Sequence, residues 1–252
     1  MIVWCDIEST GLNPRKDHLL EVAVVITDDE LNEVANATVV VQPVGVTNID
    51  ALEMDPKVRK MHTVNGLFEE VKKTPLHRYE GELQLIDVVK AAFKNVPPVE
   101  IDSCAQCRES KSKHSTSVPP PDMKARLLCQ AEGYNGSEFV TKLVPAITQT
   151  PMAGSTISFD RAFLKEHMPK LEAMFSYRSI DVSSLVELAK RWAPGIYDGR
   201  PKKADAHRGL ADVRESINYL RFFRETGFVK SNMVIVNPLV SLPSLVGGVV
   251  KS

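Results

Sequence analysis

The chain has 252 residues, a formal net charge of −1 and ordinary fractions of apolar and charged side chains. This length allows one large domain or two modest ones, and the composition is that of a globular protein rather than a fibrous or disordered one. A net charge near zero gives no global electrostatic sign of a nucleic-acid or membrane partner, although a locally basic cleft would leave that total unchanged.

The start of the chain lacks the basic segment, apolar segment and small-residue cleavage site of a secretory signal. Four cysteines are too few for a disulfide scaffold. We therefore expect a cytoplasmic protein with reduced thiols and no membrane association.

The opening run, Met-Ile-Val-Trp-Cys-Asp-Ile-Glu, predicts a buried central strand because it is almost wholly apolar. Asp6 and Glu8 are two residues apart, so their carboxylates would point to the same side of that strand. Two adjacent buried carboxylates do not both ionise without penalty, and a divalent cation between them removes that penalty. The pair therefore predicts a metal site.

The following segments alternate between strand and helix patterns. Residues 19–27 and 34–41 are rich in β-branched side chains and predict a hairpin, and residues 48–95 have helical character. Short strands are expected through Ile157 and over 177–181, with helices over 159–168, 185–192 and 210–220, the last ending before Gly227. This order predicts an α/β fold with a mixed central sheet flanked by helices.

Three further residues extend the acidic pair. Asp160 is expected where the strand through Ile157 passes into a helix, and Asp212 early in the last helix, with His207 five residues before it. If Asp205 caps that helix, His207 lies in its first turn, where the helix dipole favours the neutral imidazole of a general base.

Carboxylate oxygens suit Mg²⁺ or Mn²⁺ rather than zinc. Two such ions ~4 Å apart activate a water and stabilise the leaving oxygen of a phosphodiester. The pattern therefore predicts metal-assisted phosphodiester hydrolysis, although a single Asp in a helix is usually a solvated surface residue.

Residues 6–12 (Asp-Ile-Glu-Ser-Thr-Gly-Leu), residues 159–164 (Phe-Asp-Arg-Ala-Phe-Leu) and the pair His207 and Asp212 resemble the three motifs of the DEDDh 3′-to-5′ exonucleases. Further stretches at 61–67, 167–172, 177–185 and 191–194 resemble the oligoribonucleases within that family. The resemblance implies an RNase H-like fold and a homodimer that degrades short single-stranded RNA from its 3′ end to 5′-mononucleotides.

The resemblance also assigns roles to individual residues. It implies His207 as the general base and the four acids as ligands of two Mg²⁺ or Mn²⁺ ions: Asp6, Glu8, Asp160 and Asp212. It implies four substrate-binding residues, with the tyrosine reaching in from the partner subunit: Leu12, His62, Tyr177 and Arg178. Lys57 stands where the family usually has an aromatic residue.

Residues 97–149 form an insertion relative to the family, rich in Ser, Lys and Pro and expected to be irregular or zinc-knuckle-like. Cys104 and Cys107 have zinc-knuckle spacing, and His114 and Cys129 would complete four ligands for one structural Zn²⁺. Two alternatives are reduced thiols in a flexible segment and a redox-active pair at Cys104 and Cys107. The exonuclease domain is expected over 1–228 around this insertion, followed by an apolar tail over 229–252.

Two other functions remain open at this point. The same catalytic set serves DNA exonucleases of the proofreading or repair type. A non-catalytic nucleic-acid-binding scaffold that kept the fold is the second alternative.

Overall fold

The computed structural model describes residues 1–104, 139–202 and 207–227. The insertion residues Cys107, His114 and Cys129 lie outside the described residues, as do the side chain of Cys104, Asp205 and the tail. The proposed zinc site therefore stays a prediction. The proposed cap at Asp205 is wrong, because the last helix begins at Gly209 and Arg208 occupies its N-cap position.

A five-stranded mixed sheet has the strand order β3-β2-β1-β6-β7. The strands span Ile2–Ser9 (β1), Leu19–Thr27 (β2), Glu33–Val40 (β3), Met152–Gly154 (β6) and Ser179–Asp181 (β7). The first three pair antiparallel, whereas β6 and β7 continue the sheet parallel to β1. The strand β1 is therefore central, as its apolar sequence predicts.

Helices surround this sheet. Before the insertion they span Ile49–Ala51 (η1), Pro56–Val64 (α1), Leu67–Lys73 (α2) and Arg78–Phe93 (α3). After it they span Ala146–Gln149 (η2), Ile157–His167 (α6), Pro169–Glu172 (α7), Val182–Trp192 (α8), Pro194–Asp198 (α9) and Gly209–Thr226 (α10). The predicted mixed sheet flanked by helices is confirmed.

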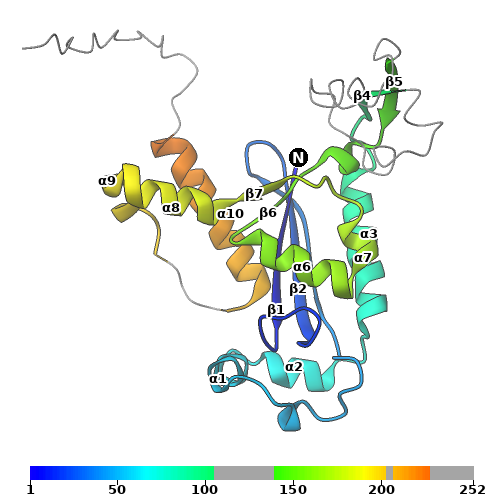
Figure 1. Ribbon diagram of the computed structural model, residues 1–252, viewed down its shortest axis with the longest axis vertical. Coiled ribbons are helices and arrows are strands. Elements are labelled where there is room, and N and C mark those ends of the chain that lie inside the picture. The colour runs from blue at the N-terminus through cyan, green and yellow to red at the C-terminus, as the bar shows by residue number, and fades with distance from the viewer. Residues whose placement is uncertain (105–138, 203–206, 228–252) are drawn as a thin grey trace, which may run out of the picture.

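The alternation of side chains along β1 divides the core into two layers. Val3, Cys5 and Ile7 pack with residues of α3, α6 and α7 on one face of the sheet. Trp4 packs on the other face with residues of α8 and α10. Figure 1 shows these helices on opposite sides of the sheet, with α1 and α2 beyond the carboxyl end of β1.

Local signals explain where several helices begin. Asp55 caps α1 by accepting a hydrogen bond from the Lys57 amide, and Pro56 opens the helix. Asp181 caps α8 in the same way through the Ser183 amide. The cap at Asp181 places the end of β7 directly against the start of α8.

Three sequence predictions need correction. The strand through Ile157 ends at Gly154, so Asp160 lies in the first turn of α6 rather than at the junction itself. Trp192 ends the helix expected over 185–192, where an apolar side chain at helical spacing predicts burial in the core. It is instead 76% exposed at the last residue of α8. The insertion is not irregular at its ends, because Val99–Cys104 (β4) and Phe139–Val144 (β5) pair as antiparallel strands.

Among the described residues, no helix combines the length and the apolar character needed to cross a membrane.

Candidate active site

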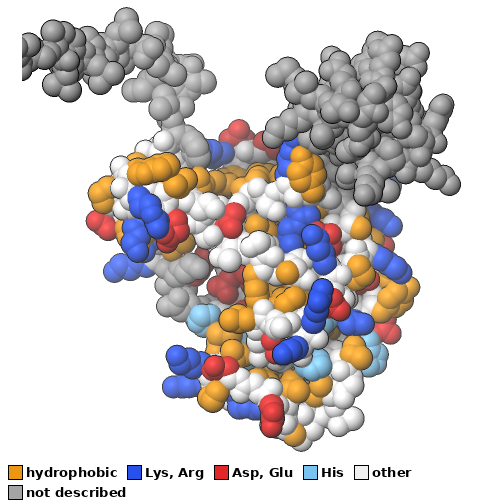
Figure 2. All heavy atoms as spheres, viewed as in Figure 1, with side chains coloured by type: hydrophobic (Ala, Val, Ile, Leu, Met, Phe, Trp, Pro, Cys, Tyr) orange, Lys and Arg blue, Asp and Glu red, His pale blue; other side chains and the backbone are white. Residues whose placement is uncertain are grey.

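Three carboxylates meet at the carboxyl end of β1. Asp6 and Glu8 on the strand and Asp212 on α10 each offer an oxygen within 4.8 Å of the others. Figure 2 shows acidic side chains set back in a hollow of the molecular surface. The structure thus brings Asp212, which is distant in the sequence, to the pair Asp6 and Glu8.

The period of β1 and the packing of α10 explain this convergence. Asp6 and Glu8 share the face of Trp4, which is the face that α10 covers. The first residue of α10 is Gly209, where a Cβ atom would lie 2.9 Å from Cβ of Ala23 and 3.4 Å from the Asp6 carbonyl oxygen. Glycine therefore lets the helix begin against the sheet, and Asp212 follows in its first turn.

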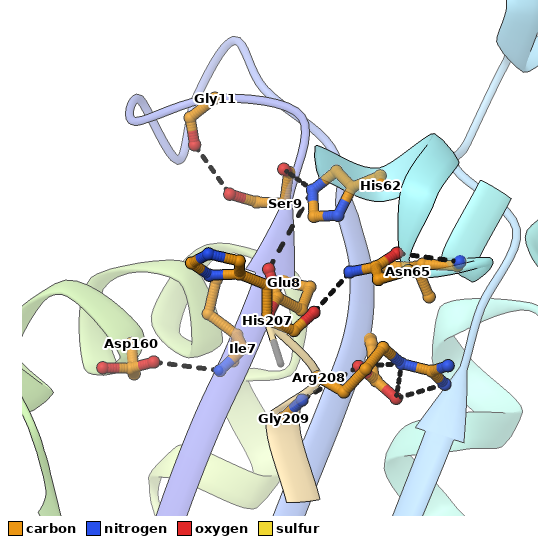
Figure 3. Close-up of polar contacts among 12 residues, drawn as sticks. Ile7, Glu8, Ser9, Gly11, His62, Asn65, Asp160, His207, Arg208 and Gly209 are labelled. Carbon is orange, nitrogen blue, oxygen red and sulfur yellow. Dashed lines mark hydrogen bonds and ion pairs between the residues drawn. The ribbon is translucent and has the colours of Figure 1, made fainter. Parts of the chain in front are cut away.

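Asp160 reaches the same strand end from the opposite layer. It lies on α6 and its side chain is 3% exposed. Its Oδ1 accepts a hydrogen bond of 3.0 Å from the backbone amide of Ile7, the residue between the two strand acids (Figure 3). The fourth acid is therefore fixed at the edge of the cluster by backbone geometry.

Burial and mutual repulsion make these carboxylates hard to ionise. Desolvation raises the pKa of Asp6 to about 9, with further contributions from Asp160, Glu8 and Asp212. Desolvation, followed by repulsion from Asp212, raises the pKa of Glu8 to about 8. Burial also raises the pKa of Asp160 to about 7, although the hydrogen bond from the Ile7 amide acts to lower it. A bound divalent cation would favour the ionised forms, so this all-oxygen donor set fits Mg²⁺ or Mn²⁺.

His207 is exposed and lies two residues before α10, so the expectation that it falls in the first helical turn is wrong. Its backbone has φ of 47°, in the left-handed region that few non-glycine residues adopt. The Asn65 side chain donates a hydrogen bond to the His207 carbonyl oxygen, and Asn65 Oδ1 accepts one from the Leu67 amide (Figure 3). The corner between α1 and α2 thus anchors the histidine backbone.

His62 is fully buried beside the same strand end. Its Nε2 donates to the Ser9 carbonyl oxygen at 2.9 Å and lies 3.9 Å from a Glu8 oxygen. Desolvation lowers the pKa of this imidazole. A neutral ring therefore packs beneath the acids, where it supports the end of β1.

Sequence reasoning missed two residues of this region. Glu21 on β2 is 1% exposed and accepts hydrogen bonds from the Gly209 amide and from the Arg208 guanidinium. Arg208 also forms a two-pronged ion pair with Glu70 on α2. A glutamate inside the otherwise apolar run 19–27 was the available signal, because a buried charge requires a partner.

Comparisons with known proteins agree on the class of enzyme. A family model described as exonuclease matches residues 3–97 and 135–220. The oligoribonuclease of Thiobacillus denitrificans is 36% identical over 226 residues, which cover 89% of this chain and 93% of the relative. The oligoribonuclease of Nocardia farcinica is 30% identical over 252 residues, covering 100% of this chain and 92% of the relative. The chain belongs to the oligoribonuclease family.

The fold has counterparts among solved structures. Exonuclease I from Methylocaldum szegediense superposes with a TM-score of 0.50 at 17% identity, over 90% of this chain. This chain spans 40% of the length of that exonuclease. The likeness therefore concerns the exonuclease fold alone.

The oligoribonuclease resemblance predicts four substrate-binding residues, which lie in two environments. Leu12 is 82% exposed in the turn after β1, whereas His62 is buried against the Ser9 carbonyl oxygen. Tyr177 is 66% exposed just before β7, and the Arg178 guanidinium lies 5.5 Å from the centre of its ring. Two of the four thus lie at the strand end, while Tyr177 and Arg178 form a separate exposed pair.

Proposed function

We propose that the acidic cluster at the end of β1 is the catalytic centre with which this chain removes 5′-mononucleotides from the 3′ ends of short oligoribonucleotides. Membership of the oligoribonuclease family supplies the activity, that of a 3′-to-5′ exonuclease on short oligonucleotides. The observation that supports the site is the meeting of Asp6, Glu8 and Asp212 within 4.8 Å, on two elements that are distant in sequence.

Asp6, Glu8 and Asp212, with Asp160 at the edge of the cluster, would hold two Mg²⁺ or Mn²⁺ ions. When bound, such ions supply an activated water and stabilise the charge that develops on the leaving oxygen. The hydrogen bond from Ile7 fixes one oxygen of Asp160, which leaves its second oxygen for a cation. The buried setting strengthens every charge interaction made there.

His207 would accept the proton of the attacking water. It is exposed, on the segment that carries Asp212 to the strand, and its backbone carbonyl is held by Asn65. Histidine is the side chain that most often serves as a general base. The rigid anchoring matters because proton transfer depends on a fixed distance between base and water.

The preference for short RNA follows from contacts at both ends of the substrate. Leu12, on the exposed turn, would pack against the bases, and Arg178 presents a planar fork suited to phosphate oxygens. Lys57, in the first turn of α1, cannot provide the aromatic stacking worth ~1–3 kcal/mol per base, but it can contact a phosphate. We therefore expect weaker discrimination by base stacking than in relatives with an aromatic residue there.

Hydrolysis of 5′-labelled RNA and DNA of two, five and twenty nucleotides tests this function. We expect Mg²⁺- or Mn²⁺-dependent cleavage that is fastest on the two- and five-nucleotide RNAs and that proceeds one nucleotide at a time. The Asp6→Asn variant, purified in parallel, controls for contaminating nucleases. Equal rates on twenty-nucleotide DNA would favour the DNA exonuclease alternative, and a lack of hydrolysis by the wild type would favour the scaffold alternative.

A further inference from the structure

Arg208 is held between two carboxylates from different elements. Its Nη1 and Nη2 donate to the two oxygens of Glu70 on α2 at 2.7 and 2.8 Å. Its Nε and Nη2 also donate to Glu21 on β2, at 3.0 to 3.3 Å. The three guanidinium nitrogens are thus all engaged within the protein. Figure 3 shows Arg208 between His207 and Gly209, at the start of α10.

The residues on either side of Arg208 are anchored by the same elements. The Gly209 amide donates to Glu21 Oε2 at 3.0 Å, and the His207 carbonyl oxygen accepts from Asn65. Three consecutive residues therefore connect to β2, to α2 and to the corner between α1 and α2. This triple anchoring coincides with the left-handed backbone of His207, a conformation that persists only where the surroundings enforce it.

We propose that Arg208 is a positioning residue, which locks the segment 207–209 onto Glu21 and Glu70 and so fixes both the general base and the metal-binding acid of α10. The inference rests on the proposed function, because the groups that it positions are His207 and Asp212. Arg208 acts through its neighbours and does not contact the substrate.

The positive charge of Arg208 also helps to position the segment, because it pairs with the buried Glu21. Glu21 is 1% exposed and close enough to Asp6 and Glu8 to raise the pKa of each. Without the Arg208 guanidinium, Glu21 would add an unpaired buried charge beside these acids. The planar fork of arginine serves two carboxylates at once, whereas a lysine ammonium serves them as a single point charge. Lysine at this position should therefore restore the charge but only part of the geometry.

Arg208→Gln and Arg208→Lys test this role in the full-length protein on a labelled short RNA. We expect kcat of Arg208→Gln to fall roughly 10- to 100-fold, because small displacements of catalytic groups have effects of that size. The KM should stay within about twofold, since no substrate contact is removed. Arg208→Lys should recover part of kcat, and Glu70→Gln, which removes one carboxylate at a half-exposed position, should lose less than Arg208→Gln.

Arg214→Gln is the matched control. Arg214 lies on the same helix and forms a similar two-pronged pair with Glu33, at 2.9 and 3.1 Å, away from the acids. We expect wild-type kcat and KM from this variant. Hydrogen exchange over residues 207–213 should speed up in Arg208→Gln and stay unchanged in Arg214→Gln.

The outcomes are separable. A raised KM with unchanged kcat in Arg208→Gln would show that Arg208 binds substrate, and matching behaviour of Arg208→Gln and Arg214→Gln would show that it positions nothing; either result overturns the inference. An inactive wild type would instead refute the proposed function, and the exchange measurement would still decide whether Arg208 anchors the segment.

Discussion

At the end of β1, two acids occupy positions that an apolar strand would otherwise fill with uncharged side chains. Glu8 is 8% exposed, and burial raises the pKa of Asp6 to about 9 and that of Glu8 to about 8. In the metal-free protein this arrangement opposes folding, because desolvated like charges repel one another. Residues that destabilise a fold in this way are typical of functional sites, where a ligand offsets the penalty.

His207 allows the roles of side chain and backbone to be separated. Asparagine tolerates the left-handed region, so His207→Asn should keep the backbone while removing the base. We expect kcat to fall about 10²- to 10⁴-fold, with Mg²⁺ affinity retained because the acids are unchanged. Steady-state kinetics and calorimetric titration of Mg²⁺ provide the measurements.

His207→Ala is the comparison for that variant. It should lose as much activity and also unfold more readily, by about 1 kcal/mol, because alanine is strained at positive φ. A near-wild-type rate in His207→Asn would remove the general-base role.

The sequence predicted the acidic residues of the site better than the residues that hold them in place. Asp6 and Glu8 follow from the two-residue period of a strand. Asp160 and Asp212 follow from the resemblance to the exonuclease motifs. The pairing of Glu21 with Arg208 joins residues 187 positions apart, so no local pattern reveals it. The position of His207 outside the helix was missed for a related reason, because the helix start is fixed by contacts of Gly209 with β1 and β2.

At the level of elements, the approach of α10 to the sheet determines whether the acids meet. Gly209→Ala would place a Cβ atom 2.9 Å from that of Ala23 and push the helix start away from β1. We expect a loss of about 1–3 kcal/mol in the free energy of unfolding, as for other overpacked sites, together with a marked fall in kcat. Chemical denaturation and the labelled-RNA assay measure the two effects.

Gly195→Ala is the control for the glycine substitution. An added Cβ atom at Gly195 meets nothing within 4 Å, and the position lies in α9. Helix propensity favours alanine there by up to about 1 kcal/mol, so this variant should be as stable as the wild type or more so, with unchanged activity. If Gly209→Ala behaved in the same way, the close approach of α10 would not matter for the site.

Helical periodicity predicted where α8 would form but not which of its apolar side chains would be buried. Leu185, Leu188 and Trp192 form an apolar stripe, yet Leu188 is 38% exposed and Trp192 76% exposed. Period alone identifies the apolar face of a helix, whereas the neighbours that cover this face depend on the tertiary arrangement. The strand order could not be predicted from the sequence either. The strands β6 and β7 are only three residues each, which is too short for a clear sequence pattern.

At the level of the whole molecule, the expected homodimer can be tested through Tyr177. If this exposed tyrosine completes the site of the partner subunit, Asp6→Asn and Tyr177→Ala should each be inactive alone. After denaturation and refolding together, each mixed dimer would contain one intact site, and random pairing would restore about a quarter of wild-type activity. Recovery no greater than the sum of the separate variants would mean that Tyr177 acts within its own subunit or outside the site.

The charge of the acidic cluster should also set how the stability of the whole molecule depends on pH. The folded-state pKa values of Asp6 (about 9), Glu8 (about 8) and Asp160 (about 7) lie above the ordinary values of these groups. At any pH between the ordinary and the raised pKa of such a group, the folded state binds more protons than the unfolded state. Raising the pH through this window therefore favours unfolding. Below about pH 6.5 the buried His62 acts in the opposite direction, because its pKa is lowered and the unfolded chain gains that proton.

We therefore expect the melting temperature in EDTA to fall between pH 6.5 and pH 9, and Mg²⁺ to restore stability increasingly towards pH 9, where it binds the ionised carboxylates. Thermal melts followed by circular dichroism at four or more pH values, with and without Mg²⁺, measure both trends. Asp6→Asn removes the group with the highest of these three pKa values, so its metal-free melting temperature should exceed that of the wild type at pH 9 and depend less on pH. A wild-type melting temperature that rises with pH in EDTA would mean that these carboxylates are ionised without penalty, and the argument for a cation between them would lose its physical basis.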